Sequence, residues 1–208
     1  MTNPDKEAAD VIYSQLADKA LIAEVLQRWA LWRDLCDWPA LKALYAPAAL
    51  MQTTWFDGSA LDFVDATSRL AGGPSRAQHY IGTPCIEVNG TRAVAQTRIT
   101  ILVRGPLDGV EVDATCYGWF IDRMVKRDGQ WLIQTRVPVY EKDTLCAVDP
   151  AVTLSLDPVR LASHPCTYKF MAYMQSQAGA TVNTGLPLPG SPAHLALLAD
   201  CAGWLAAA

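Results

Sequence analysis

The sequence has little charge for a chain of its length. Lys, Arg, Asp and Glu make up 18% of the 208 residues, against roughly 25% in typical soluble proteins. Seventeen basic and 21 acidic residues leave a net charge of −4. No run of Lys or Arg could follow a phosphate backbone, so this composition argues against a nucleic-acid-binding protein.

Long apolar runs are also missing. No segment reaches the roughly 18 uninterrupted apolar residues of a transmembrane helix. Residues 1–10 are polar and mixed in charge, unlike a signal peptide. Hydrophobic residues nevertheless make up 51% of the chain, which is too many for a disordered protein. We therefore expect a cytoplasmic globular protein, with one domain and an extension, that has no membrane partner.

The sequence lacks the ligand patterns of metal and cofactor sites. Its six cysteines are widely and irregularly spaced, and there is no C-x-x-C pair. The histidines are only three, at positions 79, 164 and 194. The motifs G-x-G-x-x-G, G-x-x-x-x-G-K-[ST], G-x-S-x-G and H-E-x-x-H are all absent. We expect no metal and no cofactor, and a site built from a few side chains in a pocket.

The charge that is present is unevenly distributed. Residues 1–147 carry 33 of the 38 charged side chains, and residues 148–208 carry five. A segment so poor in charge is unsuited to full solvation. We expect it to pack on the main domain, over a pocket mouth or on a neighbouring subunit.

The first part of the chain has the periodicity of helices. Residues 19–33 place apolar side chains at helical spacing, and a short helix over 38–45 follows, with Asp37 as its N-cap. Residues 50–56 read as a strand, closed by a turn at Asp57-Gly58. Ser59 is placed to cap a third helix that runs to Leu70.

The pattern then changes to strands. They are predicted over residues 78–88, 91–104, 110–126 and 130–142, with hairpin turns at Asn89-Gly90 and Asp128-Gly129. Helices followed by a meander of antiparallel strands indicate an α+β fold. Two further helices are predicted near the C-terminus, over 168–177 and from a cap at Ser191 to about residue 205.

The last strand suggests a subunit interface. Strict alternation puts Leu132, Gln134, Arg136 and Tyr140 on one face, as in a pocket lining, and leaves a nearly apolar opposite face that includes Trp131 and Ile133. An exposed apolar sheet face requires a cover. We therefore expect a homo-oligomer, a dimer or a trimer, built on the outer sheet face.

The order of these elements resembles the SnoaL-like family of the NTF2-like superfamily, whose members include dehydratases, a dehydrochlorinase and ketosteroid-isomerase-like proteins. The stretches that carry the resemblance are LQRWALWRDLCDWPALKAL (26–44), QHYIGTPCIEVNG (78–90) and RDGQWLIQTR (127–136). The resemblance implies a cone-shaped α+β barrel over residues 1–147, with a curved, mostly antiparallel sheet covered by N-terminal helices. Residues 148–208 would then form a C-terminal helical extension.

The resemblance also implies an Asp/His dyad, with Asp34 and His79 as its members and Arg136 as a third catalytic residue. A histidine titrates near neutrality and can take a proton from carbon. A carboxylate would hold its tautomer, and an arginine would balance developing negative charge. His79 could otherwise be a structural histidine, Asp37 competes with Asp34, and Arg136 could pair with Glu141, Asp113 or a carboxylate of another subunit.

Aromatic side chains are the candidates for contact with a small-molecule substrate. They are Trp29, Tyr45, Trp55, Tyr117, Trp119 and Tyr140. The tryptophans are equally compatible with a core role, and in a cone-shaped pocket the two roles overlap. The candidates for protonating a leaving group are Tyr45, Tyr80, Tyr117 and Tyr140.

Together with these residues, the resemblance implies a cofactor-independent lyase that removes water, or another small group such as formaldehyde, from an apolar aromatic or polycyclic molecule. One alternative is an isomerase that uses the same base. Another is a non-catalytic binding module of the same fold, whose pocket would be filled by side chains and whose Asp34 and His79 would lie apart.

Overall fold

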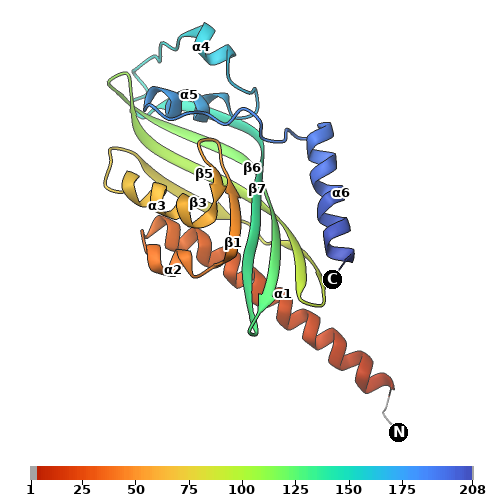
Figure 1. Ribbon diagram of the computed structural model, residues 1–208. Helices are drawn as coiled ribbons and strands as arrows, with labels where there is room; N and C mark the ends of the chain where they lie inside the picture. The colour runs from red at the N-terminus through yellow and green to blue at the C-terminus, as the bar shows by residue number, and fades with distance from the viewer. Residues whose placement is uncertain (1–3, 208) are drawn as a thin grey trace.

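The computed structural model describes residues 4–207, and its elements follow the order helices, sheet, helices (Figure 1). The helices are α1 (Pro4–Asp34), α2 (Trp38–Lys42), α3 (Ala60–Leu70), α4 (Pro158–Ala162), α5 (Lys169–Gln177) and α6 (Pro192–Ala206). The strands are β1 (Tyr45–Gln52), β2 (Asp57–Ser59), β3 (Arg76–Ile81), β4 (Cys85–Asn89), β5 (Arg92–Leu107), β6 (Val110–Arg127) and β7 (Gln130–Ala147). This is an α+β fold with a mostly antiparallel sheet, as the sequence predicts.

Side-chain caps set the starts of three helices. Asp37 accepts a hydrogen bond from the backbone N–H of Ala40, Ser59 from that of Asp62, and Ser191 from that of His194. Each side chain satisfies a backbone donor that the first turn of a helix leaves unpaired. All three predicted caps are confirmed. The short helix α4 was not predicted, although Asp157 caps it in the same way.

The strands form one sheet in the order β2-β1-β7-β6-β5-β3, and β4 pairs with another part of β5. The predicted hairpin turns are confirmed, with left-handed backbone at Gly90 (φ 55°) and Asp128 (φ 50°). The predicted strand over 78–88 is two strands, since residues 82–84 leave the ladder at a Gly and a Pro. The first strand begins at Tyr45 rather than at residue 50 and runs parallel to β7.

Two bulges in β7 decide which side chains face inward. At the first, Gln134 is the extra residue, because the pairing with β6 jumps from Thr135 to Ile133. Trp131 and Ile133 are therefore buried in the same core as Tyr140. The prediction that they share an outer apolar face was wrong, because a bulge reverses the alternation of side chains along a strand.

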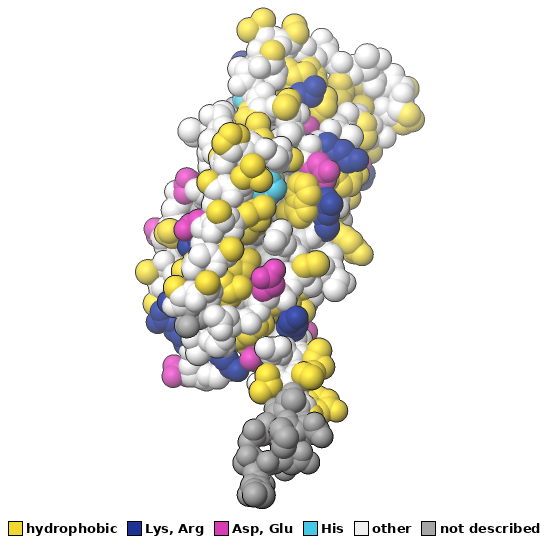
Figure 2. Space-filling view, turned by 90° about the vertical axis from the view of Figure 1, so that its right-hand side faces the viewer, with side chains coloured by type: hydrophobic (Ala, Val, Ile, Leu, Met, Phe, Trp, Pro, Cys, Tyr) yellow, Lys and Arg dark blue, Asp and Glu magenta, His cyan; other side chains and the backbone are white. Residues whose placement is uncertain are grey.

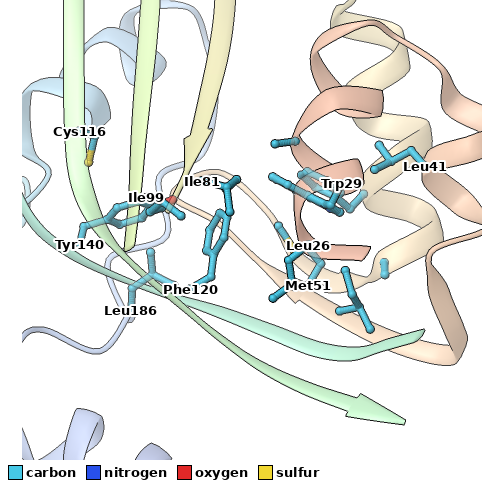
Figure 3. Close-up of a cluster of buried hydrophobic side chains, with 14 of the residues drawn as sticks. Leu26, Trp29, Leu41, Met51, Ile81, Ile99, Cys116, Phe120, Tyr140 and Leu186 are labelled. Atoms are coloured by element: carbon cyan, nitrogen blue, oxygen red, sulfur yellow. The ribbon is translucent and has the colours of Figure 1, made fainter. Parts of the chain in front are cut away.

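The main core lies between the inner face of the sheet and helices α1 to α3. Figure 3 shows Trp29 and Leu26 of α1 facing Met51 and Phe120 of the sheet. Trp29 is 1% exposed and its ring meets that of Phe120 edge-on, 5.4 Å between centroids. The core extends along the sheet to Tyr140. There the sheet is covered by α5 rather than by the N-terminal helices.

Part of the outer sheet face is covered by the chain's own last helix. Cys201 and Leu205 of α6 pack on Val94, Ile121 and Val139, on the side of the sheet opposite α3 (Figure 1). The expectation that a second copy must cover this face is thus corrected for the area under α6. Whether the chain forms an oligomer stays a prediction.

Basic and amide side chains hold the C-terminal end of α6. Arg92 donates to the carbonyl of Trp204 at 2.7 Å, and Asn89 donates to that of Leu205 at 3.0 Å. The last carbonyls of a helix lack the usual bonds to the following turn, and a positive charge is favourable at this end of the helix dipole. The face seen in Figure 2 mixes hydrophobic with charged side chains rather than presenting one uniform apolar surface.

Candidate active site

A cavity of about 1000 Å³ opens between the inner face of the sheet, helices α1 and α3, and helix α5. Its wall is mostly apolar and aromatic, which is typical of a small-molecule site. The side chains of α5 that reach it include Met171, Met174 and Gln175. The charge-poor C-terminal segment therefore contributes to the wall.

Asp34 and His79 meet on this wall. The imidazole Nδ1 of His79 lies 2.6 Å from Oδ1 of Asp34, and the backbone N–H of His79 donates to Oδ2 at 2.7 Å. One carboxylate thus fixes both the strand and the ring. With the proton on Nδ1, the other ring nitrogen Nε2 is left as an acceptor on a residue that lines the cavity.

The end of α1 brings Asp34 to this position. Asp34 is the last residue of the helix, and Cys36 adopts φ 60°, which turns the chain away. The helix therefore stops where its carboxylate faces the cavity. Trp29, nearly a turn and a half earlier, also lines the cavity and meets the His79 ring edge-on at 5.4 Å.

Burial sets the protonation state of His79. Its side chain is 9% exposed, and desolvation lowers its pKa below the ordinary value of 6.5, against the opposing effect of the Asp34 hydrogen bond and charge. The positive charges of Arg33 and Arg136 lower the pKa further. At neutral pH the imidazole is therefore uncharged and able to accept a proton.

Arg136 lies behind the wall rather than on it. It forms a bidentate ion pair with Asp122, in which Nε donates to Oδ1 at 2.6 Å and Nη2 donates to Oδ2 at 3.0 Å. Both side chains are at most 1% exposed. Its guanidinium is stacked 4.3 Å from the ring centroid of Trp29 and 4.2 Å from that of Phe120. Arg136, predicted as a third catalytic residue, is therefore not among the residues that line the cavity, because this pairing and stacking hold the guanidinium in the core.

Four of the six predicted aromatic contacts lie on or beside the cavity wall, and the other two lie on the outer face of the sheet. Trp29, Trp55 and Tyr140 line the cavity. Tyr45 is buried beside it, accepting a hydrogen bond from the indole of Trp29 at 2.6 Å, and burial raises its pKa to about 12.

Tyr117 and Trp119 lie on the outer face of the sheet. The ammonium group of Lys142 sits 5.3 Å from the ring of Tyr117, and Trp119 packs in the cluster under α6. Sequence reasoning assigned them to the pocket because it did not fix which face of β6 points inward. Of the four tyrosines considered as proton donors, Tyr140 alone lines the cavity, since Tyr80 is 70% exposed.

Arg33 is a cavity residue that the sequence analysis missed. It lies next to Asp34 and lines the same wall. Burial lowers the pKa of its guanidinium, and the charge of Asp34 only partly opposes this. Its position in the last turn of α1, beside the candidate carboxylate, was the available signal.

No group of three or more potential metal ligands occurs among the residues that the structure describes. None of the described helices is long and apolar enough to cross a membrane.

Residues 14–137 match the model of the SnoaL-like domain, which is more than half of the chain, so the protein belongs to the SnoaL-like family of the NTF2-like superfamily. Pea pathogenicity protein 2 of Fusarium vanettenii is 29% identical over 181 residues, covering 86% of this chain and 77% of that protein. Because the 181 aligned residues exceed the 137 that precede the end of the family match, this similarity extends into the C-terminal segment.

Solved structures that share the fold include two that are named for elimination reactions. A putative scytalone dehydratase from Novosphingobium aromaticivorans has a TM-score of 0.54 at 21% identity, over 69% of this chain and 99% of that chain. A hexachlorocyclohexane dehydrochlorinase has a TM-score of 0.57 at 13% identity, over 69% and 97%. The structural neighbours of the chain thus include lyase-type enzymes.

Proposed function

We propose that the protein is a cofactor-independent lyase that removes water, or another small group such as formaldehyde, from an apolar aromatic molecule. The observation that carries the proposal is the Asp34–His79 pair, joined at 2.6 Å on the wall of a large, mostly apolar cavity. The enzymes among the structural neighbours, a putative dehydratase and a dehydrochlorinase, are consistent with elimination chemistry.

In the proposed step, Nε2 of neutral His79 takes a proton from carbon. The electron pair of that C–H bond forms the new C=C bond while the C–O bond of the neighbouring hydroxyl-bearing carbon breaks. The departing oxygen takes a proton from the imidazolium and leaves as water, which regenerates the base. For loss of formaldehyde, Nε2 instead takes the O–H proton of a hydroxymethyl group, the C–C bond to that group breaks to release formaldehyde, and the imidazolium returns the proton to the carbon left behind. Asp34 stabilises the imidazolium in between and keeps the ring in place.

Tyr140 is the tyrosine placed to contact the substrate in this scheme. Burial raises its pKa well above the ordinary value of 10. A phenol with so high a pKa stays protonated, so its role is to donate a hydrogen bond to a substrate oxygen rather than to lose its proton. The His79 side chain is only 9% exposed, which limits the access of bulk water to the base and favours proton transfer within the cavity.

A binding module without catalysis fits the structure less well. That hypothesis requires a cavity filled by side chains and a separated Asp34 and His79, whereas the cavity has about 1000 Å³ and the two residues are hydrogen-bonded. The isomerase hypothesis uses the same base and differs only in the product, which makes product mass the deciding measurement.

The test is turnover of a panel of aromatic β-hydroxy ketones and acids, followed by mass spectrometry. We expect a product lighter by one water or one formaldehyde, and about 10²–10⁴-fold slower turnover in Asp34→Asn and His79→Ala. Asp37→Asn is the matched control, because Asp37 is close in sequence but caps α2 and does not contact His79. A product of unchanged mass would establish an isomerase, and full turnover in both dyad variants would refute the mechanism.

A further inference from the structure

The cavity wall is more positive than the protein as a whole. The chain carries a net charge of −4, yet the charged residues that line the cavity are three arginines and two aspartates, namely Arg33, Arg69, Arg76, Asp34 and Asp108. Asp34 is already engaged by two N–H groups of His79, the backbone N–H and the ring Nδ1. An acidic protein thus has one net positive charge among the residues that line its cavity.

Arg33 is one of the arginines that have no carboxylate partner among the described side chains. Five arginines form carboxylate pairs, Arg28 with Glu24, Arg98 with Glu141, Arg104 with Asp113, Arg123 with Asp200 and Arg136 with Asp122. Among residues 9–207, whose side chains the structure describes, the Arg33 guanidinium makes no such pair, and it lies 6.0 Å from the ring centroid of Trp38.

The Arg33 side chain is also partly buried. Desolvation of a charge costs free energy unless an opposite charge or hydrogen bonds compensate. Asp34 is adjacent in sequence but directs both oxygens to His79. The donors of Arg33 are therefore available to a ligand inside the cavity, beside the candidate base.

We propose that Arg33 determines specificity by binding a carboxylate group of an aromatic substrate. The guanidinium fork matches the two oxygens of a planar carboxylate, and such charge-assisted pairs are the stronger hydrogen bonds. The aromatic part would lie against Trp29, Trp55 and Phe63, which line the same cavity. The substrate class is thus an aromatic acid whose reacting carbon lies close to its carboxylate, near His79.

Arg69 and Arg76 have a different position. Both are exposed at the rim, at the end of α3 and the start of β3, and Arg76 also donates to the carbonyl of Gly73 at 2.8 Å. Exposed charges raise the local concentration of an anionic ligand but contribute little to a fixed contact. They are expected to affect the rate of association, whereas Arg33 selects the carboxylate.

The identification of the substrate as an acid rests on the proposed function, but carboxylate binding is measurable without turnover. The experiment compares 2-naphthoate with its neutral analogue 2-naphthamide by calorimetric titration at pH 7.5. We expect the wild-type protein to bind naphthoate about 10- to 100-fold more tightly. Arg33→Gln should abolish this preference while leaving the affinity for naphthamide unchanged, and Arg28→Gln, from the exposed face of the same helix, should keep it.

Arg33→Lys retains the charge without the fork and should give an intermediate preference, which provides the test if Arg33→Gln does not fold. The proposal is overturned if naphthoate binds no more tightly than naphthamide, if neither binds, or if Arg69→Gln rather than Arg33→Gln removes the preference. A tighter binding of the phenolate of a nitronaphthol than of naphthoate would likewise refute carboxylate selection. His79→Gln should keep the preference, so a failed lyase hypothesis with intact carboxylate binding would be recognised as such.

Discussion

At the scale of single residues, the chemistry depends on two opposing effects on one imidazole. Burial lowers the pKa of His79, while the hydrogen bond and charge of Asp34 raise it. The result is a ring that is neutral at pH 7 and held at Nδ1, with Nε2 left to accept a proton. Removing either influence should shift the titration of His79 in a known direction.

The variant Asp34→Asn should therefore lower the pKa of His79 further. The amide lacks the negative charge that stabilises the imidazolium, and desolvation then acts almost unopposed. NMR titration of the histidine ring protons measures this directly. His164, in the C-terminal segment, should keep its midpoint in the same spectra, and a rise in the pKa of His79 would contradict the assignment of the hydrogen bond.

The ion pair of Arg136 and Asp122 is expected to act on stability. Asp122→Asn leaves a guanidinium buried without its counter-charge, which costs about 3–5 kcal/mol of unfolding free energy. Urea denaturation measures the loss. The double variant Asp122→Leu/Arg136→Met should recover much of it, because it removes both charges together, and a loss below about 1 kcal/mol in Asp122→Asn would show that the pair is not needed.

At the scale of elements, the contact between β6 and β7 is set by Gly118, opposite the second bulge of β7, where Glu141 is the extra residue. A Cβ built on Gly118 would lie 2.4 Å from the carbonyl oxygen of Val139 and 2.9 Å from Cα of Tyr140. The two strands approach too closely there for any side chain. Tyr140, which lines the cavity, is positioned by this approach.

Gly118→Ala should therefore destabilise the fold by about 1–3 kcal/mol, since backbone atoms must move to make room. Thermal unfolding provides the measurement. Gly203→Ala in α6 is the matched control, because a Cβ at that position would meet no atom within 4 Å and Ala favours a helix over Gly by about 1 kcal/mol. Equal stability of the two variants would contradict the close approach.

Local sequence patterns predicted most helices, strands and turns correctly. They did not predict which face of a strand points into the core. The caps at Ser59 and Ser191, the turns at Gly90 and Asp128, and the α+β class all follow from chemistry within a few residues. The bulge at Gln134 does not, because it arises from pairing with another strand. The inward direction of β6 is fixed by tertiary packing too, which is why Tyr117 and Trp119 were placed in the pocket.

Part of the candidate site was predictable from the sequence, and part was not. The resemblance identified the spacing of Asp34 and His79, and the structure brings these two side chains together. It also directed attention to Arg136, whose buried partner Asp122 no sequence pattern indicates. Arg33 was missed because its lack of a partner is visible only once the positions of the carboxylates are known.

At the scale of the whole molecule, the low charge content has a structural explanation. The C-terminal segment packs on the rest of the chain in two places. Helix α5 lines the cavity, and helix α6 lies on the outer face of the sheet. Asp143 of β7 fixes α5 by accepting hydrogen bonds from the backbone N–H groups of Phe170 and Met171, at 2.6 and 2.8 Å. The residues that make these contacts are packed and need no charge, whereas Val159 and Leu195 of the same segment are exposed.

The lowered pKa of His79 should also affect how the stability of the whole protein depends on pH. In the unfolded chain a histidine titrates near about 6.5, and in the fold His79 titrates lower. Its contribution to stability is therefore complete above about pH 6.5 and is lost as the pH falls toward the lowered folded value. Urea unfolding of the wild-type protein and of His79→Gln from pH 8 to pH 5 should show the wild-type protein losing more stability. A constant difference would refute a lowered pKa.

The central claim is that a neutral His79, oriented by Asp34, removes a proton inside the cavity. Its most direct test is the pH dependence of kcat/KM for a substrate from the aromatic panel, in the wild-type protein and in Asp34→Asn. The wild-type profile should rise with pH through a value below 6.5, the ordinary pKa of histidine. Asp34→Asn should shift this rise to lower pH and reduce the plateau, by about 10²-fold or more. The same profile and the same plateau in both proteins would contradict the account.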